Sequence, residues 1–330
     1  MPRIRQGKKR KVQTWEQTIA NRIKDGKAVP IISSQINHNL VLGGFEKSSQ
    51  NYVEYRSYPI DERHPIPRVA QYYSIIDEAI TDARSLKDDY VNFIKNKLFD
   101  IAENDGVPRG TLAEVEEEFD NIDLSEFSER LGYPRFDRAE VEPLVRLADL
   151  PLPIYLTTDY HDFIEVALRR AGKNPRTEIC RWHKGLDSIP SVFDGKYQPT
   201  KDEPLVYHLL GYDAYPESMV LTEDEHLEFL IAIRQNLGRD TDPISLRVRQ
   251  AMAESSVILL GYSLRDLDFK VVFWGLIKPR PIPQTSVSVQ LPPSDVERAF
   301  LEKYLNTFEF RVYWGDIQKY TNELSEALES

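Results

Sequence analysis

The sequence predicts an α/β protein with a doubly wound, mostly parallel sheet and a helical insertion. Residues 257–260 form a continuous aliphatic run of strand length without polar alternation, which is typical of a strand covered on both faces. Similar short apolar segments alternate along the chain with segments of helical spacing, as in parallel sheets. With 330 residues, 41% of them hydrophobic and 29% charged, the chain can bury a full core.

The first expected elements are a short helix and a buried strand. Thr14 can cap a helix over residues 15–24, because apolar residues recur there at four-residue spacing, and Gly26 ends it. Residues 29–32, Val-Pro-Ile-Ile, predict the first strand of the sheet.

A long charged segment, residues 55–150, predicts the insertion. Helical spacing of apolar residues covers 70–86, 90–102 and 121–133, and the Thr-x-x-Glu pattern at 111–114 indicates a capping box that starts another helix. We expect these helices to pack over the mouth of a cleft at the carboxyl ends of the strands.

Strands and helices alternate from there to the end of the chain. The expected strands are 152–158, 178–182, 204–209, 257–260, 286–291 and 308–314, and the expected helices are 139–147, 159–171, 222–237, one beginning at 242, 264–277, 294–304 and 316–328. Ligands of open parallel sheets bind beyond the carboxyl ends of strands, where backbone N–H groups and helix N-termini converge. The turn after Leu260 is therefore where we expect a nucleotide-sized ligand.

This turn carries a motif with a family resemblance. The segment Gly261-Tyr262-Ser263-Leu264-Arg265-Asp266-x-Asp268-Phe269 resembles the closing motif of bacterial sirtuin-like (silent-information-regulator-type) domains, in which it holds the adenosine ribose of NAD. Residues 153–162 and 204–225 resemble two further family motifs in the same order. The resemblance implies a sirtuin-like, Rossmann-type domain formed by 14–54 and 151–330, with 55–150 inserted.

The resemblance also implies which residues would hold an NAD or ADP-ribose-like nucleotide. They are Ser33, Ser34, Gln35, Thr158, Gly211, Gly261, Tyr262, Ser263 and Asp266. In the family, the first strand runs into Gly-Ala-Gly, where bare backbone lies against the phosphates. Side chains at 33–35 obstruct that close approach and the positive φ that glycine allows. Gly43-Gly44 is an alternative phosphate turn, although a surface turn is the favoured interpretation.

The family positions that cleave NAD differ as well. The family has an asparagine after the second strand and a histidine base directly before a glycine, whereas this chain has Asp159 and Leu210 there, with His161 at a family aspartate position. Leucine exchanges no proton, and an ionised aspartate only accepts hydrogen bonds. His208 or His161 are possible replacement bases. The favoured interpretations are that His208 is a buried structural residue and that Asp159 caps the next helix.

Composition limits the other classes of function. The single cysteine, Cys180, excludes an internal disulfide and fits a reducing compartment. No apolar run approaches the roughly 20 residues of a membrane span, and the N-terminus lacks the apolar core of a signal peptide, so we expect a cytoplasmic protein. His38, His64, His183 and His226 have unrelated spacings, so no metal site is expected.

Charge bears on possible partners. The net charge of -11 argues against a wide nucleic-acid surface. Residues 1–13 nevertheless hold six Lys or Arg residues and almost nothing apolar. A disordered, solvated arm is the favoured interpretation, and contact with nucleic acid or an acidic partner is the alternative.

Three hypotheses for function follow. In the first, the chain is a catalytically degenerate sirtuin-like subunit, structural or nucleotide-binding, and the resemblance implies prokaryotic defence against phages and plasmids, in an oligomer or heterocomplex with a sensor or effector protein. In the second, it is an active NAD glycohydrolase that depletes cellular NAD, using Asp159 with His161 or His208. In the third, it is a nucleic-acid-associated module that acts through residues 1–13. Protein deacetylation is disfavoured, because the zinc cysteines and the histidine of deacetylating sirtuins are absent.

Overall fold

The computed structural model describes residues 15–36, 45–59, 64–139, 142–279, 287–291, 298–308 and 310–329. The basic segment 1–13, the expected cap Thr14 and the Gly43-Gly44 turn lie outside these ranges.

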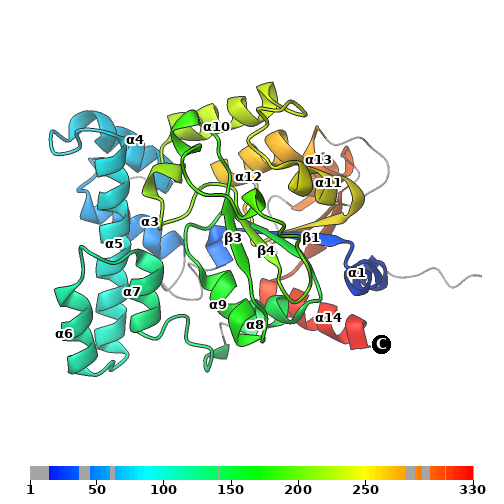
Figure 1. The fold of residues 1–330 in the computed structure, drawn as a ribbon, viewed down its shortest axis with the longest axis horizontal. Helices are drawn as coiled ribbons and strands as arrows, with labels where there is room; N and C mark the ends of the chain where they lie inside the picture. The colour runs from blue at the N-terminus through cyan, green and yellow to red at the C-terminus, as the bar shows by residue number, and fades with distance from the viewer. Residues whose placement is uncertain are drawn as a thin grey trace, which may run out of the picture.

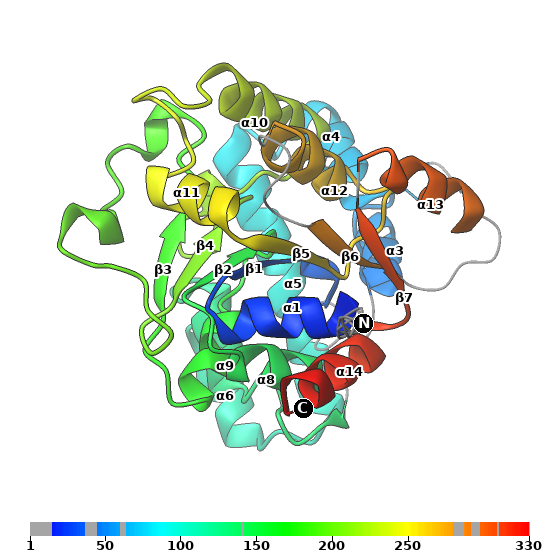
Figure 2. The ribbon, with the colours of Figure 1, turned by 90° about the vertical axis from the view of Figure 1, so that its right-hand side faces the viewer.

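A seven-stranded parallel sheet forms the centre of the molecule (Figure 2). The strands are β1 (Ala28–Ile32), β2 (Ile154–Thr157), β3 (Arg176–Ile179), β4 (Leu205–His208), β5 (Ser256–Leu260), β6 (Val287–Leu291) and β7 (Arg311–Trp314), in the order β3-β4-β2-β1-β5-β6-β7. Every residue of β1, β2, β4 and β5 is buried. The expected doubly wound α/β sheet is confirmed, and all seven expected strands are present, with ends that differ by up to three residues.

Helices cover both faces of this sheet, which explains why its central strands are buried along their whole length and are mostly apolar (Figure 2). One face carries α1 (Trp15–Lys24), α8 (Glu142–Asp149), α9 (Phe163–Arg170) and α14 (Ile317–Glu329). The other carries α10 (Glu223–Gln235), α11 (Leu246–Glu254), α12 (Leu267–Val272) with its π-helical continuation η5 (Phe273–Ile277), and α13 (Arg298–Asn306). Helix α10 begins with the capping box that the sequence predicts, Thr222 with Glu225.

A separate group of helices stands beyond the carboxyl edge of the sheet (left in Figure 1). It comprises α3 (Phe45–Tyr55), α4 (Ile66–Ile76), α5 (Ala83–Asn104), α6 (Arg109–Glu117) and α7 (Leu124–Arg130). Lys87 of α5 forms a buried ion pair with Glu225 (2.8 Å), and Ser125 of α7 donates to the carboxylate of Asp213, in the loop after β4. These contacts anchor the group of helices to the start of α10 and to the loop after β4.

Two predictions for the insertion are wrong. The expected helix 70–86 is two helices, because Asp82 and Ser85 form a capping box that starts α5 and the chain leaves α4 at Asp77. The expected capping box at Thr111 does not exist, because α6 already begins at Arg109, after Pro108, and Thr111 lies inside it.

Three helix starts in the sheet domain were also predicted too early. The helix expected from 159 begins at Phe163, so Asp159 does not cap it, and its N-cap is Asp162. The helix expected from 264 begins at Leu267, and the one expected from 242 begins at Leu246, capped by Ser245. No helix in the described part of the chain combines the length and the apolar character needed to cross a bilayer.

Candidate functional site

The candidate site lies at the carboxyl edge, where β1 stands between β2 and β5. Connections leave these strands toward opposite faces of the sheet, and such a switch point is where open α/β sheets bind ligands. We divide the edge into a β1–β5 end, formed by residues 33–36 and 261–268, and a β2–β4 end, formed by residues 158–165 and 208–211.

The backbone N–H groups of the turn after β1 form hydrogen bonds within the protein. The N–H of Ser33 donates to the carbonyl of Leu260 (3.0 Å), and that of Ser34 donates to the hydroxyl of Thr158 (3.3 Å). The next two N–H groups turn back to the hydroxyl and the carbonyl of Ser33 (3.2 and 3.1 Å). Phosphate-binding turns leave such groups open toward the ligand. All four N–H groups of residues 33–36 are instead engaged within the protein.

Side chains of this turn bind the closing motif. The amide of Gln35 donates to the carboxylate of Asp266, and the hydroxyl of Ser34 lies 3.5 Å from Oδ2 of Asp268. The other oxygen of Asp268 faces Nε2 of His226 on α10 (3.0 Å), and Nδ1 of this histidine faces the backbone carbonyl four residues earlier (2.7 Å). The β1–β5 end is therefore a connected polar network in which the phosphate-turn positions contact two carboxylates.

The electrostatics of this network disfavour a phosphate. Burial raises the pKa of Asp266 to about 7, and the neighbouring Asp268 acts in the same direction, while the hydrogen bond from Gln35 opposes both. A carboxylate pair repels an anionic ligand and suits hydroxyl donors such as those of a ribose.

A cavity of about 390 Å³ opens beside this end, between α12 and α13. It is bordered by Tyr262 and Ser263 of the motif and by the rings of Phe269, Phe273 and Tyr304. Phe269 and Phe273 are stacked, with ring centroids 5.7 Å apart. Aromatic walls next to a polar turn suit a flat heterocycle that carries a sugar.

Asp159, at the β2–β4 end, is completely buried in its own loop. Its backbone N–H donates to the hydroxyl of Thr157 (3.0 Å), and its Oδ1 accepts from the N–H of Tyr160 (2.9 Å). Its carbonyl lies 2.7 Å from Nδ1 of His208. The carboxylate stabilises the turn after β2 and does not cap α9.

Both histidines of this end are buried with it. Nε2 of His208 lies 3.0 Å from Oε1 of Glu165 on α9. Burial lowers the pKa of His208, but Glu165 and Asp159 together raise it by more, so the pKa lies above its ordinary value. His161 lies 3.7 Å from Oδ1 of Asp159. Burial, together with His208, lowers the pKa of His161 to about 3, which makes it a poor proton acceptor at neutral pH.

The position of the family's base is apolar and tightly enclosed. Leu210 is completely buried, and its carbonyl accepts from the N–H of Val220 (2.8 Å). Gly211 has a φ of +104°, and a Cβ there would lie 2.5 Å from the backbone nitrogen of Met219. The glycine is required both by the backbone conformation and by the close approach of a second chain segment.

The predicted site residues thus form two groups. Ser33, Ser34, Gln35, Thr158, Tyr262 and Asp266 are joined by hydrogen bonds, and Asp159, His161 and His208 lie together; Gly261, with a φ of +72°, packs against Ile36. Tyr262 reaches the hydroxyl of Thr158 (3.4 Å) and so links the two ends.

Sequence reasoning missed three residues of this site. Asp268 stood in the quoted motif but was not assigned a role. His226 and Glu165 gave no signal, since each lies on a helix far along the chain from its partner. No group of three or more His, Cys, Asp or Glu residues in the described ranges is arranged to hold a metal ion.

The fold and the site define a class: a Rossmann-like α/β domain with a topological switch point at the carboxyl edge of its parallel sheet. Residues 153–313, slightly less than half of the chain, match the model of the SIR2-like domain. The chain contains a SIR2-like domain, and the sirtuin-like fold that the sequence predicts is confirmed.

A more specific likeness is to the NAD(+) hydrolase ThsA of Cytobacillus dafuensis. The two are 25% identical over 170 residues, which are 48% of this chain and 31% of that protein. The chain therefore aligns with about a third of the length of this curated relative.

Proposed function

We propose that the chain is a catalytically degenerate SIR2-like domain, which binds the adenosine part of an NAD-type ligand and does not cleave it. The observation that carries this proposal is the fully buried Leu210 at the position of the family's base. No proton acceptor replaces it well, because His208 is hydrogen-bonded to Glu165 inside the fold and His161 has a pKa of about 3. Cleavage of the nicotinamide–ribose bond needs a base for the incoming water or ribose hydroxyl.

The two ends of the edge support different parts of the proposal. The cavity bordered by Tyr262 and Ser263 supports binding of a base, and the carboxylates of Asp266 and Asp268 in the same motif support binding of its ribose. The engaged N–H groups of residues 33–36 argue that the diphosphate is held weakly by the turn after β1. An NAD-type ligand is favoured by the SIR2-like match and by the similarity to an NAD(+) hydrolase.

We further propose that the domain acts in prokaryotic defence against phages and plasmids, together with a sensor or effector protein. This part rests on the family resemblance of the three motifs in residues 153–269 and on the match to ThsA. A subunit without a catalytic base contributes by binding or by structure, so its effect on cells would require the partner.

The test separates binding from cleavage. Release of nicotinamide from NAD is measured with the purified chain and with the chain mixed with candidate partners, while binding of NAD and ADP-ribose is measured by calorimetry. We expect binding without release by the chain alone. Tyr262→Ala should weaken binding, and Ile231→Ala, at an exposed position on α10, is the matched control.

The alternative is an active NAD hydrolase that uses Asp159 with His161 or His208. The similarity to an NAD(+) hydrolase favours it, as does the 3.7 Å approach of His161 to Asp159. Nicotinamide release at enzymatic rates, lost in both Asp159→Asn and His208→Gln variants that remain folded, would establish the alternative and exclude the degenerate domain. His183→Ala, at a partly exposed histidine, serves as the control for loss of a histidine elsewhere.

A further inference from the structure

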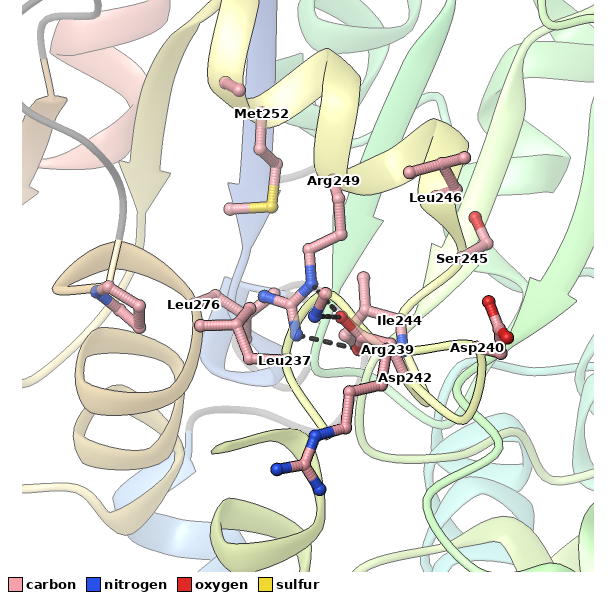
Figure 3. A pocket seen from close by; sticks show the side chains of 13 residues that line it. Leu237, Arg239, Asp240, Asp242, Ile244, Ser245, Leu246, Arg249, Met252 and Leu276 are labelled. Atoms are coloured by element: carbon pink, nitrogen blue, oxygen red, sulfur yellow. Dashed lines mark hydrogen bonds and ion pairs between the residues drawn. The ribbon is translucent and has the colours of Figure 1, made fainter. Parts of the chain in front are cut away.

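A second cavity lies away from the carboxyl edge, between the end of α10, helix α11 and the end of η5 (Figure 3). Its volume is about 690 Å³, which is within the range of small-molecule sites. None of the residues of the β1–β5 or β2–β4 ends lines it. Any ligand here is therefore distinct from the one proposed at the sheet edge.

The cavity has an apolar floor and an apolar rim. Ile244, Met252 and Leu276 are buried in the core and form the floor, whereas Leu237 and Leu246 are large apolar side chains exposed at the surface. Covering such a surface with an apolar ligand is favourable, because the hydrophobic effect scales with the apolar area removed from water.

Arg249 borders this cavity, and hydrogen bonds hold its guanidinium in place. Nε and Nη2 of Arg249 donate to the two carboxylate oxygens of Asp242 (3.0 and 2.9 Å), which also accept from the N–H groups of Gly238 and Ile244. The loop and the guanidinium are thereby fixed in place. Among the described residues, Nη1 of Arg249 has no acceptor, so one edge of a rigid guanidinium remains available to a ligand.

A second arginine of the lining carries a charge that no described carboxylate contacts. Asp242 offsets the charge of Arg249, but the guanidinium of Arg239 makes no hydrogen bond or ion pair with any residue that the structure describes. In Figure 3 the side chains of Arg239 and Asp240 extend in different directions from the loop, so Asp240 does not cover this guanidinium.

We propose that this cavity binds a small organic acid with an apolar body. The body lies on the floor formed by Ile244, Met252 and Leu276, and the carboxylate accepts hydrogen bonds from Arg239 and from Nη1 of Arg249. The charge of Arg239 then selects the acid over a neutral molecule of the same shape.

Decanoate is the probe, used below its micelle-forming concentration, and decanamide is its neutral counterpart. Binding of each is measured by ligand-observed NMR with the full chain at pH 7.5 and low salt. We expect decanoate to bind at least about fivefold more tightly than decanamide. Arg239→Gln should remove this preference while decanamide binding stays unchanged. Arg234→Gln, at an exposed arginine of α10 outside the cavity, should keep the preference.

A second variant locates the site. Ala253 lines the cavity from an exposed position of α11, so Ala253→Trp fills the space without disturbing the core, and it should abolish binding of both probes. The proposal is overturned if the wild-type chain binds neither probe, if it does not distinguish them, if Arg239→Gln retains the preference, or if Ala253→Trp binds as the wild type does. Circular dichroism of each variant verifies the fold.

Discussion

The two ends of the carboxyl edge differ in how their polar groups are used. At the β2–β4 end, Asp159, His161 and His208 are buried, and the hydrogen bonds of Asp159 and His208 described above stay within the protein. At the β1–β5 end, Ser263 and Asp268 are partly exposed, and Ser263 borders a cavity. Of these two segments of one sheet edge, one is part of the core and the other has a surface that a ligand can reach.

This difference shows why chemically reactive side chains do not by themselves make an active site. A histidine acts as a base only when its free nitrogen faces the substrate and its pKa suits the pH. Both ring nitrogens of His208 face protein acceptors, and burial keeps His161 neutral far below pH 7. The proposed function therefore assigns these residues to stabilising a loop.

The largest expected losses in the free energy of unfolding come from substitutions of two glycines, one at each end of the edge. In Gly211→Ala the new Cβ meets the backbone of Met219 at a positive φ, so we expect a loss of about 4 kcal/mol in the free energy of unfolding, from strain and overpacking together. In Gly261→Ala the Cβ meets only the side chain of Ile36, 2.8 Å from its Cδ1, so about 2 kcal/mol is expected.

Urea unfolding of both variants measures these losses. Gly172→Ala is the control, because its φ of +78° is similar and nothing lies within 4 Å of the added atom, so that only the strain of about 1 kcal/mol is expected. Adding Ile36→Ala should relieve Gly261→Ala in a double-mutant cycle. Equal losses at Gly211 and Gly172 would contradict the close packing at the β2–β4 end.

The next effect concerns the buried pair of Glu165 and His208. Glu165→Leu leaves the imidazole buried without its carboxylate, so we expect a loss of about 3 kcal/mol in the free energy of unfolding. The double variant Glu165→Leu with His208→Leu should recover part of this loss, because no imidazole is then buried without its carboxylate, although the hydroxyl of Thr177 and the carbonyl of Asp159 lose their partners. A single variant as stable as the wild type would show that the pair is not structural.

The contributions of the two ends to stability are expected to depend on pH in opposite directions. His161 takes up a proton near pH 6.5 when unfolded but only near pH 3 when folded, so its contribution to stability is lost as the pH falls from about 6.5 toward 3. Asp266 loses its proton near pH 4 when unfolded and near pH 7 when folded, so its contribution is lost as the pH rises from about 4 to 7.

Variants separate these contributions. His161→Phe should remove the loss of stability that occurs as the pH falls, and Asp266→Asn the loss that occurs as the pH rises, each with a slope of up to about 1.4 kcal/mol per pH unit. The two pH windows overlap, so the sign of the slope identifies each contribution. Urea midpoints across this range measure both. The comparison of the two ends is contradicted if either substitution changes the slope in the opposite direction.

The smallest effect is expected at Gln35. Gln35→Ala removes the hydrogen bond to Asp266, so we expect a loss of about 1 kcal/mol and a further rise in the pKa of Asp266. Carboxyl titration by NMR measures the pKa. Gln50→Ala, which removes an exposed hydrogen bond to Glu54, should change stability by less than about 0.5 kcal/mol.

The sequence predicted the strands much better than the starts of the helices. Buried parallel strands are continuous apolar runs, so β1 and β5 were visible directly. The start of α9 was not, because Asp159 resembles a cap, whereas its carboxylate accepts from the next N–H and the helix starts four residues later. The break between α4 and α5 was not visible either, because the apolar periodicity continues across it. The break depends on the hydrogen bonds between Asp82 and Ser85 that start α5.

For the site, the sequence named residues that the structure brings together at the carboxyl edge, but not the partners that bind them. The motif at 261–269 identified the turn, and the leucine before Gly211 was evident. The bonds of Asp268 to His226 and of His208 to Glu165 join residues at least 42 positions apart, and such pairs follow from packing rather than from any local pattern. The cavity beside α11 depends on three separate segments and was not predicted.

The ion pair of Lys87 and Glu225 has a consequence for how quickly a ligand could enter. Glu225 also accepts from the N–H groups of Leu221 and Thr222 and so holds the start of α10. Moving α5 away from the sheet would break the ion pair and leave this carboxylate without its cationic partner. If that opening costs about 3 kcal/mol, fewer than about one molecule in a hundred is open at any moment. A ligand that required the open form would arrive correspondingly slowly, and the apparent affinity would fall by the same factor.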